Sequence, residues 1–514
     1  MGIKGIYKEI GPGKRISLCK LAVDHFKQTE CKRPFRLAVD FAIWAHQLQA
    51  AQGGASPAMR TLFYRLVRLV TLNIDPIFVF DGPRKPAFKR NKRSRREGDT
   101  LSKAMAQQII RLFGFATHNA PGEAEAECAL LQREGIVDAV LSEDVDTIMF
   151  GCTRTLRNWS AEGRNRAQTP THVSLYDAAE MRQDETGLDR EGLVLVALMS
   201  GGDYAPEGVP GCGVKLACEA AKAGFGTRLC RIKRSETAAL QTWRDDLIRE
   251  LKTNESKFFR VKHKALTIPE EFPDFEILRH YTHPVVSDAA TIARMKAEFP
   301  PERAINVVGL RAFTAETFDW SYRPGALKLI RVLAPALLIR ALVDCSGHNT
   351  CSKAEEKSEA SLIQCVVQSR MHFSTDATPE LRVKYIPNAA VGLKLDEEED
   401  VDADATSTYG RAGLALNSDD GEIDEADAQD EKEPPKKIYD PHEADLCWVP
   451  EAIVKHGAPL IVESWDREQK DKTNRSTKAA KAARPAARFS IKNFGRLTKD
   501  ISPHAPSRKK KPTE

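Results

Sequence analysis

Short apolar runs alternate with amphipathic segments over roughly the first 230 residues of the chain. Three of these runs predict buried strands, at 35–39, 76–80 and 139–141. Segments with apolar side chains at helical spacing lie between and after them, at 43–48, 57–70, 101–113, 123–134 and 189–200. Parallel strands need a long connection between them, which is usually a helix. This order therefore predicts an α/β fold with a mostly parallel sheet covered by helices on both faces.

The pattern changes beyond the first 205 residues. A glycine-rich turn at 208–213 opens onto a helix that starts near Val214, and 236–345 is predicted to be mainly helical. Antiparallel strands are predicted within 361–394, and order is expected to return at 446–450. The predicted divisions are two parts of one α/β domain, a helical lobe, a small β-rich module and a disordered basic tail: 1–100, 101–205, 206–345, 361–466 and 467–514.

Charge is distributed unevenly along the chain, although the net charge is only +5. Residues 84–96 hold eight basic side chains in thirteen positions, and 467–514 holds fifteen basic against four acidic ones. Residues 396–433 hold sixteen acidic against two basic side chains and almost no aromatic ones, which predicts disorder. A basic block inside an apolar-patterned domain indicates a polyanionic partner.

Two classes of protein are disfavoured by the composition. The eleven cysteines form no C-x-x-C pair, so neither a zinc module nor a disulfide framework is indicated, and reduced intracellular thiols are expected. No apolar run approaches the roughly 18 residues of a membrane span, and no secretory signal is recognised. We therefore expect no membrane partner.

Acidic side chains recur where predicted strands or helices begin or end. Seven are collected at five such places: Asp40, Asp81, Glu123 with Glu125, Asp144 with Asp146, and Asp203. Loops at the carboxyl ends of parallel strands are where open α/β sheets bind ligands. Oxygen ligands without His or Cys favour Mg²⁺ or Mn²⁺, and two such ions can assist an in-line phosphoryl displacement.

Each of these residues also has an ordinary structural explanation. A single aspartate after a strand usually caps a turn or a helix. The run Glu123, Glu125, Glu127 is more often a solvated helix face, and Glu127 is a rival ligand because it lies four residues after Glu123. Five acidic places separated by alternating strands and helices favour the metal site.

Six motifs carry a resemblance to a known family when they are taken in order. They are MGIKGIYKEI, VDFAIWAH, FVFDG, APGEAEAECALL, SEDVDTIMFG and SGGDYAPEGVPGCGVKLA. Over 1–225 the chain resembles the flap-endonuclease (xeroderma pigmentosum group G, Rad2-type) structure-specific nucleases. The resemblance implies a PIN-like, Rossmann-type fold and hydrolysis of a DNA phosphodiester that leaves a 5′ phosphate. It also implies two Mg²⁺ ions, replaceable by Mn²⁺, on the seven carboxylates, whereas Glu127 falls outside the family pattern.

The same resemblance implies three surfaces that contact DNA. A helix-two-turn-helix element would use Gly211, Gly213 and Lys215 to approach a phosphate, although this chain lacks the proline of the usual turn. Gly2, with Ile3, Ile6 and the helices of 43–70, would form a wedge at the junction. A basic arch would use the side chains Lys85, Lys89, Arg90, Lys92, Arg93, Arg95 and Arg96. The alternatives for this stretch are a nuclear localisation signal and a solvated run, and its place between the second and third acidic sites favours the arch.

The short connection between Asp81 and Glu123 resembles that of the Holliday-junction resolvase branch, whose members carry a chromodomain-like module. We therefore expect a nuclear resolvase that makes paired symmetric nicks, also cuts 5′ flaps, is a monomer in solution and forms a homodimer on the junction. Residues 508–512 would serve as a nuclear localisation signal or as a non-specific contact to DNA. The alternatives are a monomeric 5′-flap endonuclease or 5′ exonuclease, and a non-catalytic junction-binding scaffold.

Overall fold

The computed structural model of the protein describes residues 2–482. Gaps in the described residues fall at 30–31, 52–53, 87, 90–91, 94–101, 163–168, 184–186, 300–303, 345–361 and 401–438. Within these limits the chain divides into one compact unit up to Val462 and a second unit that begins at Glu463. None of the described helices is long and apolar enough to cross a membrane.

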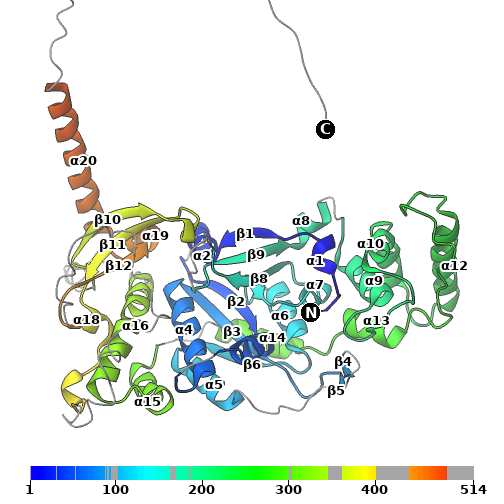
Figure 1. Ribbon diagram of the computed structural model, residues 1–514, viewed down its shortest axis with the longest axis horizontal. Coiled ribbons are helices and arrows are strands. Elements are labelled where there is room, and N and C mark those ends of the chain that lie inside the picture. The colour runs from blue at the N-terminus through cyan, green and yellow to red at the C-terminus, as the bar shows by residue number, and fades with distance from the viewer. Residues whose placement is uncertain are drawn as a thin grey trace, which may run out of the picture. The chain divides into compact units, whose positions relative to one another are not determined.

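A seven-stranded sheet with strand order β1-β9-β8-β7-β2-β3-β6 forms the centre of the first unit (Figure 1). Its parallel strands are β2 (Phe35–Asp40), β3 (Ile74–Phe80), β6 (Ala116–Asn119), β7 (Ala139–Leu141) and β8 (Arg154–Ser160). β9 (His172–Asp177) pairs antiparallel with both β8 and β1 (Lys14–Ser17). The predicted mostly parallel α/β sheet is confirmed. The strands are short, and β3 is buried at every position, as expected of a strand covered on both faces.

The antiparallel edge of this sheet was not predicted. β8 has a mixed polar sequence, RTLRNWS, in which the last four residues are only partly buried or exposed. β1 has only four residues, two of them basic. Apolar runs reveal strands that are buried on both faces, so short polar edge strands such as these escape detection.

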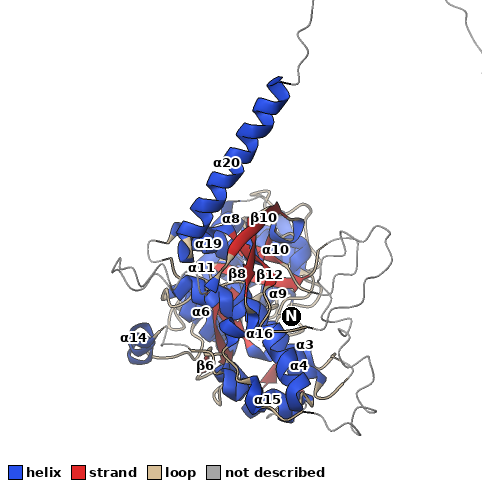
Figure 2. Cartoon of the chain, turned by 90° about the vertical axis from the view of Figure 1, so that its left-hand side faces the viewer, coloured by secondary structure: helices blue, strands red, loops and turns tan. Residues whose placement is uncertain are grey.

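Helices surround the strands of the first unit (Figure 2). In the α/β domain these are α1 (Ile6–Glu9), α2 (Leu18–Gln28), α3 (Phe41–Leu48), α4 (Pro57–Thr71), α5 (Lys103–Leu112), α6 (Ala124–Arg133), α7 (Asp146–Met149), α8 (Ala178–Gln183) and α9 (Arg190–Ser200). A two-stranded ribbon, β4 (Phe88–Lys89) with β5 (Lys92–Arg93), stands within the basic stretch. The predicted helices of this part are confirmed, whereas the ribbon was not predicted.

The predicted helical lobe is also present. It contains α10 (Val214–Lys222), α11 (Phe225–Arg231), α12 (Thr237–Thr253), α13 (Phe275–Thr282), α14 (Ala289–Glu298), α15 (Val307–Phe318) and α16 (Tyr322–Asp344). α10 begins directly after Gly213, as predicted from the glycine-rich turn. α10 and α11 pack on α9 and extend the apolar core of the α/β domain, in which Leu216, Phe225 and Trp243 are buried.

Residues 362–457, called the C-terminal module below, contain a three-stranded antiparallel sheet in the order β10-β11-β12. Its elements are β10 (Cys365–Met371), the 3-10 turn η2 (Phe373–Thr375), β11 (Pro379–Tyr385), α18 (Pro387–Val391), the 3-10 turn η3 (Leu395–Glu397), β12 (Asp445–Pro450) and α19 (Glu451–Gly457). The predicted strands are confirmed. The likeness of this module to a chromodomain stays a prediction.

Disorder was predicted for the acidic segment 396–433 and for the basic tail, and each prediction was wrong at its N-terminal end. Residues 396–400 are ordered because Arg311 binds both carboxylate oxygens of Glu398, at 2.8 and 2.6 Å. The rest of the predicted acidic segment, 401–433, lies outside the described residues. The predicted basic tail begins as a helix, since α20 spans Pro459–Ala482 in a sequence rich in the strong helix formers Lys, Glu and Ala. Residues 483–514, which include the predicted localisation signal, also lie outside the described residues.

An aspartate of the C-terminal module caps a helix of the α/β domain. Oδ2 of Asp376 accepts a hydrogen bond from the backbone N–H of Ser17 at 2.6 Å, and Oδ1 lies 3.0 Å from Nε2 of His172. Ser17 is the N-cap residue of α2 and is fully buried. Its hydroxyl donates to the backbone oxygen of Ser374 at 2.8 Å. These contacts join η2 to the antiparallel edge of the large sheet.

We expect Asp376→Ala to lower the free energy of unfolding by about 1 kcal/mol, the typical effect of a lost helix cap. Burial alone would raise the pKa of Asp376, but hydrogen bonds from Ser17 and His172 lower it below the ordinary value. The stabilisation should therefore be complete above about pH 4 and disappear as the pH falls through the folded-state pKa. Urea unfolding at several pH values checks this, with the exposed Asp400→Ala as the control. Equal effects of the two substitutions at neutral pH would contradict it.

Candidate active site

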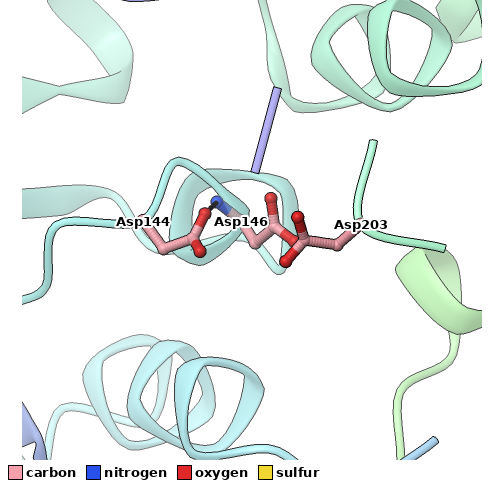
Figure 3. Close-up of side chains that lie close together, drawn as sticks. All are labelled: Asp144, Asp146 and Asp203. Carbon is pink, nitrogen blue, oxygen red and sulfur yellow. Dashed lines mark hydrogen bonds between the residues drawn. The ribbon is translucent and has the colours of Figure 1, made fainter. Parts of the chain in front are cut away.

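Three carboxylates meet at the carboxyl end of the parallel strands. Asp144, Asp146 and Asp203 are all buried, and one oxygen from each lies within 4.8 Å of the others. Figure 3 shows the side chains of Asp146 and Asp203 turned toward each other, with Asp144 alongside. We call these residues the aspartate triad. Buried charges of one sign repel one another, so the arrangement favours a cation between them.

The loop after β7 positions two members of the triad. Asp144 accepts a hydrogen bond on Oδ1 from the backbone N–H of Asp146 at 3.2 Å, drawn as a dashed line in Figure 3. The hydroxyl of Ser142 accepts from the backbone N–H of Asp144 at 3.2 Å. Asp146 then begins the short helix α7. The third member, Asp203, follows α9 after a turn at Gly201, whose φ of 98° favours glycine.

Asp40 joins this arrangement from the end of β2. Its carboxylate is fully buried and caps α3, because Oδ1 accepts from the backbone N–H of Ala42 at 3.0 Å. Its second oxygen lies 3.5 Å from the hydroxyl of Ser142. The structural explanation of Asp40 as a helix cap therefore holds, and it does not exclude a role as ligand, since the cap uses one of the two oxygens.

Asp81 is held at the start of α6 by a close approach of two loops. The backbone N–H of Gly82 donates to the oxygen of Gly122 at 2.7 Å, and a Cβ on Gly82 would lie 1.8 Å from the oxygen of Ala120. Only glycine fits at this contact. Asp81 thereby accepts on Oδ1 from the backbone N–H of Ala124 at 3.0 Å, the first residue of α6. Its second oxygen lies 3.3 Å from Nζ of Lys85, so this predicted DNA contact reaches back to the site.

Glu123 is linked to the triad by a tyrosine that was not predicted. Glu123 is the N-cap residue of α6, and its Oε2 accepts a short hydrogen bond from the hydroxyl of Tyr204. Tyr204 directly follows Asp203 in the chain, so this bond connects the start of α6 to the third triad residue. The position of Tyr204 next to Asp203 could have indicated a residue of the site, but Glu123, to which Tyr204 donates, lies 81 positions away in the sequence.

The remaining two glutamates of α6 differ in their surroundings. Glu125 is buried in the first turn. Glu127 is fully buried, with Oε1 2.8 Å from Nε2 of His118 and Oε2 accepting from the backbone N–H of Ser287 at 2.9 Å. Burial alone would raise the pKa of Glu127, but hydrogen bonds from His118 and Ser287 lower it. His118 and Ser287 hold the two oxygens of Glu127, which gives this rival ligand a structural explanation.

The predicted DNA contacts have varied surroundings in the structure. Gly2 has a φ of 71°, and a Cβ there would lie 2.4 Å from Oδ1 of Asp146, so the start of the chain passes directly over the triad. Gly211 adopts a φ of 81° in the turn before α10. Lys89, Lys92 and Arg93 belong to the β4–β5 ribbon, and Gly213 and Lys215 lie at the start of α10. Arg90, Arg95 and Arg96 lie outside the described residues.

The chemistry of this donor set fits a hard divalent cation. The predicted ligands offer carboxylate oxygens only, and the triad residues, Asp40, Glu123 and Glu125 are buried. Carboxylates gathered in this way suit Mg²⁺ or Mn²⁺ rather than zinc, which prefers His and Cys. The structure brings the triad together and joins Asp40 and Glu123 to its loops through Ser142 and Tyr204. Asp81 is joined to the start of α6. These residues therefore favour a site at which bound divalent cations assist a reaction of the substrate.

Three family models match the chain in order. They are the XPG N-terminal domain at 1–103, the XPG I-region at 114–203 and the Holliday junction resolvase Gen1 C-terminal domain at 362–468. Flap endonuclease GEN homolog 1 of Homo sapiens is 30% identical over 202 residues, 35% of this chain. The match spans only 22% of the length of that relative. Flap endonuclease 1 of Thermofilum pendens is 28% identical over 278 residues, 46% of this chain and 70% of its own length.

Solved structures extend the similarity to nearly the whole chain. A structure of the Holliday junction-resolving enzyme GEN1 in complex with product DNA and Mg²⁺ is 53% identical, with a TM-score of 0.74. A structure of a eukaryotic junction-resolving enzyme GEN-1 with potassium is 54% identical, with a TM-score of 0.75. Each match covers 91% of this chain and 100% of the solved chain. The chain therefore belongs to the XPG (Rad2-type) family of structure-specific nucleases, in its GEN1 branch.

Proposed function

We propose that this protein is a Mg²⁺-dependent DNA endonuclease that resolves four-way junctions by paired symmetric nicks and also cuts 5′ flaps. The observation that carries the proposal is the buried aspartate triad. It occurs in a chain of which 91% matches the structure of GEN1 in complex with product DNA and Mg²⁺. A further structure of GEN1 is a complex with product DNA, Mg²⁺ and Mn²⁺ ions, and the carboxylate donor set of this chain suits both ions.

The residues that would hold the ions are those at the carboxyl end of the sheet: Asp40, Asp81, Glu123, Glu125, Asp144, Asp146 and Asp203. A pair of bound divalent ions would activate a water molecule and offset charge on the attacking and leaving oxygens. The protein itself orients the carboxylates through Ser142, Ala124 and Tyr204. Hydrolysis forms a bond from water oxygen to phosphorus and breaks the bond to the 3′ oxygen, leaving a 5′ phosphate and a 3′ hydroxyl.

Symmetric incision of a junction needs two active sites. We therefore propose that the protein is a monomer in solution and that two protomers meet on the junction. The contacts to DNA would come from Gly2, from Gly211, Gly213 and Lys215 beside α10, and from the arch residues Lys85, Lys89, Arg90, Lys92, Arg93, Arg95 and Arg96. Neutralised phosphates make such binding sensitive to salt. A nuclear location follows from this substrate and from the basic residues of 508–512.

Cleavage of end-labelled immobile junctions and 5′ flaps with Mg²⁺ tests the proposal, beside an Asp144→Asn control. We expect paired symmetric nicks on the junction and incision of the flap, both lost in the control and both lost with a chelator. Cleavage of flaps alone would favour a monomeric flap endonuclease, an alternative that the similarity to flap endonuclease 1 supports. Binding without cleavage by the unaltered protein would favour a non-catalytic scaffold.

A further inference from the structure

A buried network ties α6 to the segment between α13 and α14. Glu127 lies one helical turn after Glu123 and has no exposed surface. It accepts a hydrogen bond from the backbone N–H of Ser287 at 2.9 Å and lies 2.8 Å from Nε2 of His118. A charged group without exposed surface is very costly unless it is paired and hydrogen-bonded. These hydrogen bonds therefore hold His118 and Ser287 in fixed positions relative to α6.

The same segment also contacts the turn before α6, and the end of α13 reaches Glu123 through a tyrosine. A Cβ on Gly122 would lie 2.5 Å from the backbone oxygen of Val285, so residues 283–287, called the strap below, rest on the turn before Glu123. The preceding residues of α13 also take part, because the ring centroid of Tyr281 lies 4.7 Å from that of Tyr204. Tyr204 in turn donates to Glu123. The first turn of α6 is therefore connected to Tyr281 before the strap, through Tyr204, and to Ser287 at the end of the strap.

His118 connects the network to the strand that carries Asp81. In the parallel pairing of β6 with β3, His118 is opposite Val79, two residues before Asp81. Glu127 therefore joins three parts of the fold: the helix with Glu123 and Glu125, the strand pair leading to Asp81, and the strap. Packing alone does not require a charge at this position, since replacing a buried ion pair by apolar residues is often neutral or stabilising.

We propose that Glu127 is a positioning residue, which holds α6 between His118 and Ser287 so that its glutamates are placed to bind the divalent cation. The inference rests on the proposed metal-dependent function and names a residue outside the family's seven carboxylates. Residues that hold metal ligands in place typically change metal affinity about 10- to 100-fold when altered. Glu127 is expected to act on metal affinity more than on DNA affinity.

The experiment compares the full-length protein with Glu127→Met and Glu127→Gln. Mn²⁺ binding is measured by electron paramagnetic resonance without DNA, and single-turnover junction cleavage is measured against Mg²⁺ concentration. We expect Glu127→Met to weaken Mn²⁺ binding and raise the half-maximal Mg²⁺ concentration at least about tenfold, with junction affinity in a chelator unchanged. Glu127→Gln keeps an oxygen that can accept from Ser287, so it should retain most of the cation affinity.

A matched control lies on the same helix. Glu134, at the end of α6, pairs with Lys296 of α14 at 2.7 Å and is 42% exposed, so Glu134→Gln removes a contact between α6 and α14 that lies away from the site. It should behave like the unaltered protein. Glu127→Met with reduced thermal stability but full Mn²⁺ affinity would overturn the proposal and leave a purely structural role.

A second variant keeps the inference testable if Glu127→Met does not fold. His118→Ala removes one partner of Glu127 and leaves the bond to Ser287, so we expect a smaller, several-fold loss of Mn²⁺ affinity. Unchanged affinity in this variant would also overturn the proposal. If the proposed function is wrong, the unaltered protein binds Mn²⁺ but cuts no DNA. The comparison of Mn²⁺ affinity between the variants then still decides the role of Glu127.

Discussion

Asp146→Asn is expected to reduce the rate of junction cleavage at saturating Mg²⁺ by at least about a thousandfold. Asp146 is fully buried and contributes an oxygen to the aspartate triad. An asparagine of the same shape cannot supply the negative charge that holds a divalent cation. Metal ions contribute several kcal/mol of charge stabilisation in such reactions, and each 1.36 kcal/mol changes a rate about tenfold.

Thermal unfolding with and without Mg²⁺ separates this loss from misfolding. Removing one charge from a buried cluster of like charges should leave the melting temperature in chelator unchanged or higher. Mg²⁺ should stabilise the unaltered protein, because a ligand that binds only the folded state shifts the equilibrium toward it. It should not stabilise the variant to the same extent. An Asp146→Asn protein with at least a tenth of the original rate would contradict the assignment of the triad.

Asp177→Asn is the matched control for this prediction. Asp177 ends β9 of the large sheet and caps α8, since its Oδ1 accepts from the backbone N–H of Ala179 at 2.9 Å. It lies outside the predicted ligand set. Asparagine is as good a cap as aspartate, so both the cleavage rate and the response of the melting temperature to Mg²⁺ should stay close to those of the unaltered protein.

The three central parallel strands, β2, β3 and β7, were predictable because nearly all of their residues are buried. β2 and β3 appear in the sequence as mainly apolar runs that end beside Asp40 and Asp81, whereas the partly exposed parallel strands β6 and β8 were not predicted. Residues that follow such strands gather at one edge of the sheet, and this rule accounts for Asp40 after β2 and for Asp144 and Asp146 after β7. Asp203 joins them from the end of the helix α9. Periodicity along the chain is enough to indicate a site of this kind.

Contacts between distant segments were not predictable by the same reasoning. The bond from Tyr204 to Glu123 and the cap that Asp376 places on Ser17 depend on how whole elements pack, which no local pattern encodes. Glu127 illustrates the limit most clearly. Its spacing from Glu123 is that of a helical face, and only the positions of His118 and Ser287 show that this face is occupied by a buried network.

Gly2→Ala is expected to slow junction cleavage by about ten- to a hundredfold. Gly2 adopts a φ of 71°, and a Cβ there would lie 2.4 Å from Oδ1 of Asp146 and 2.5 Å from Oδ1 of Asp144. Either the carboxylates or the start of the chain must move. Strain at one such residue is on the order of 1–3 kcal/mol, and each 1.36 kcal/mol lost in the transition state is about a factor of ten in rate.

Gly11→Ala separates the steric effect at Gly2 from backbone strain. Gly11 has a similar φ of 80°, but a Cβ there would meet nothing within 4 Å. Both variants therefore place alanine in the left-handed region, and only Gly2→Ala pushes a methyl group against the triad. Single-turnover cleavage across Mg²⁺ concentrations should show a higher Mg²⁺ requirement for Gly2→Ala alone. If the two variants cleave at equal rates, backbone strain accounts for the whole loss of rate. The residues at the start of the chain then do not influence the carboxylates of the triad.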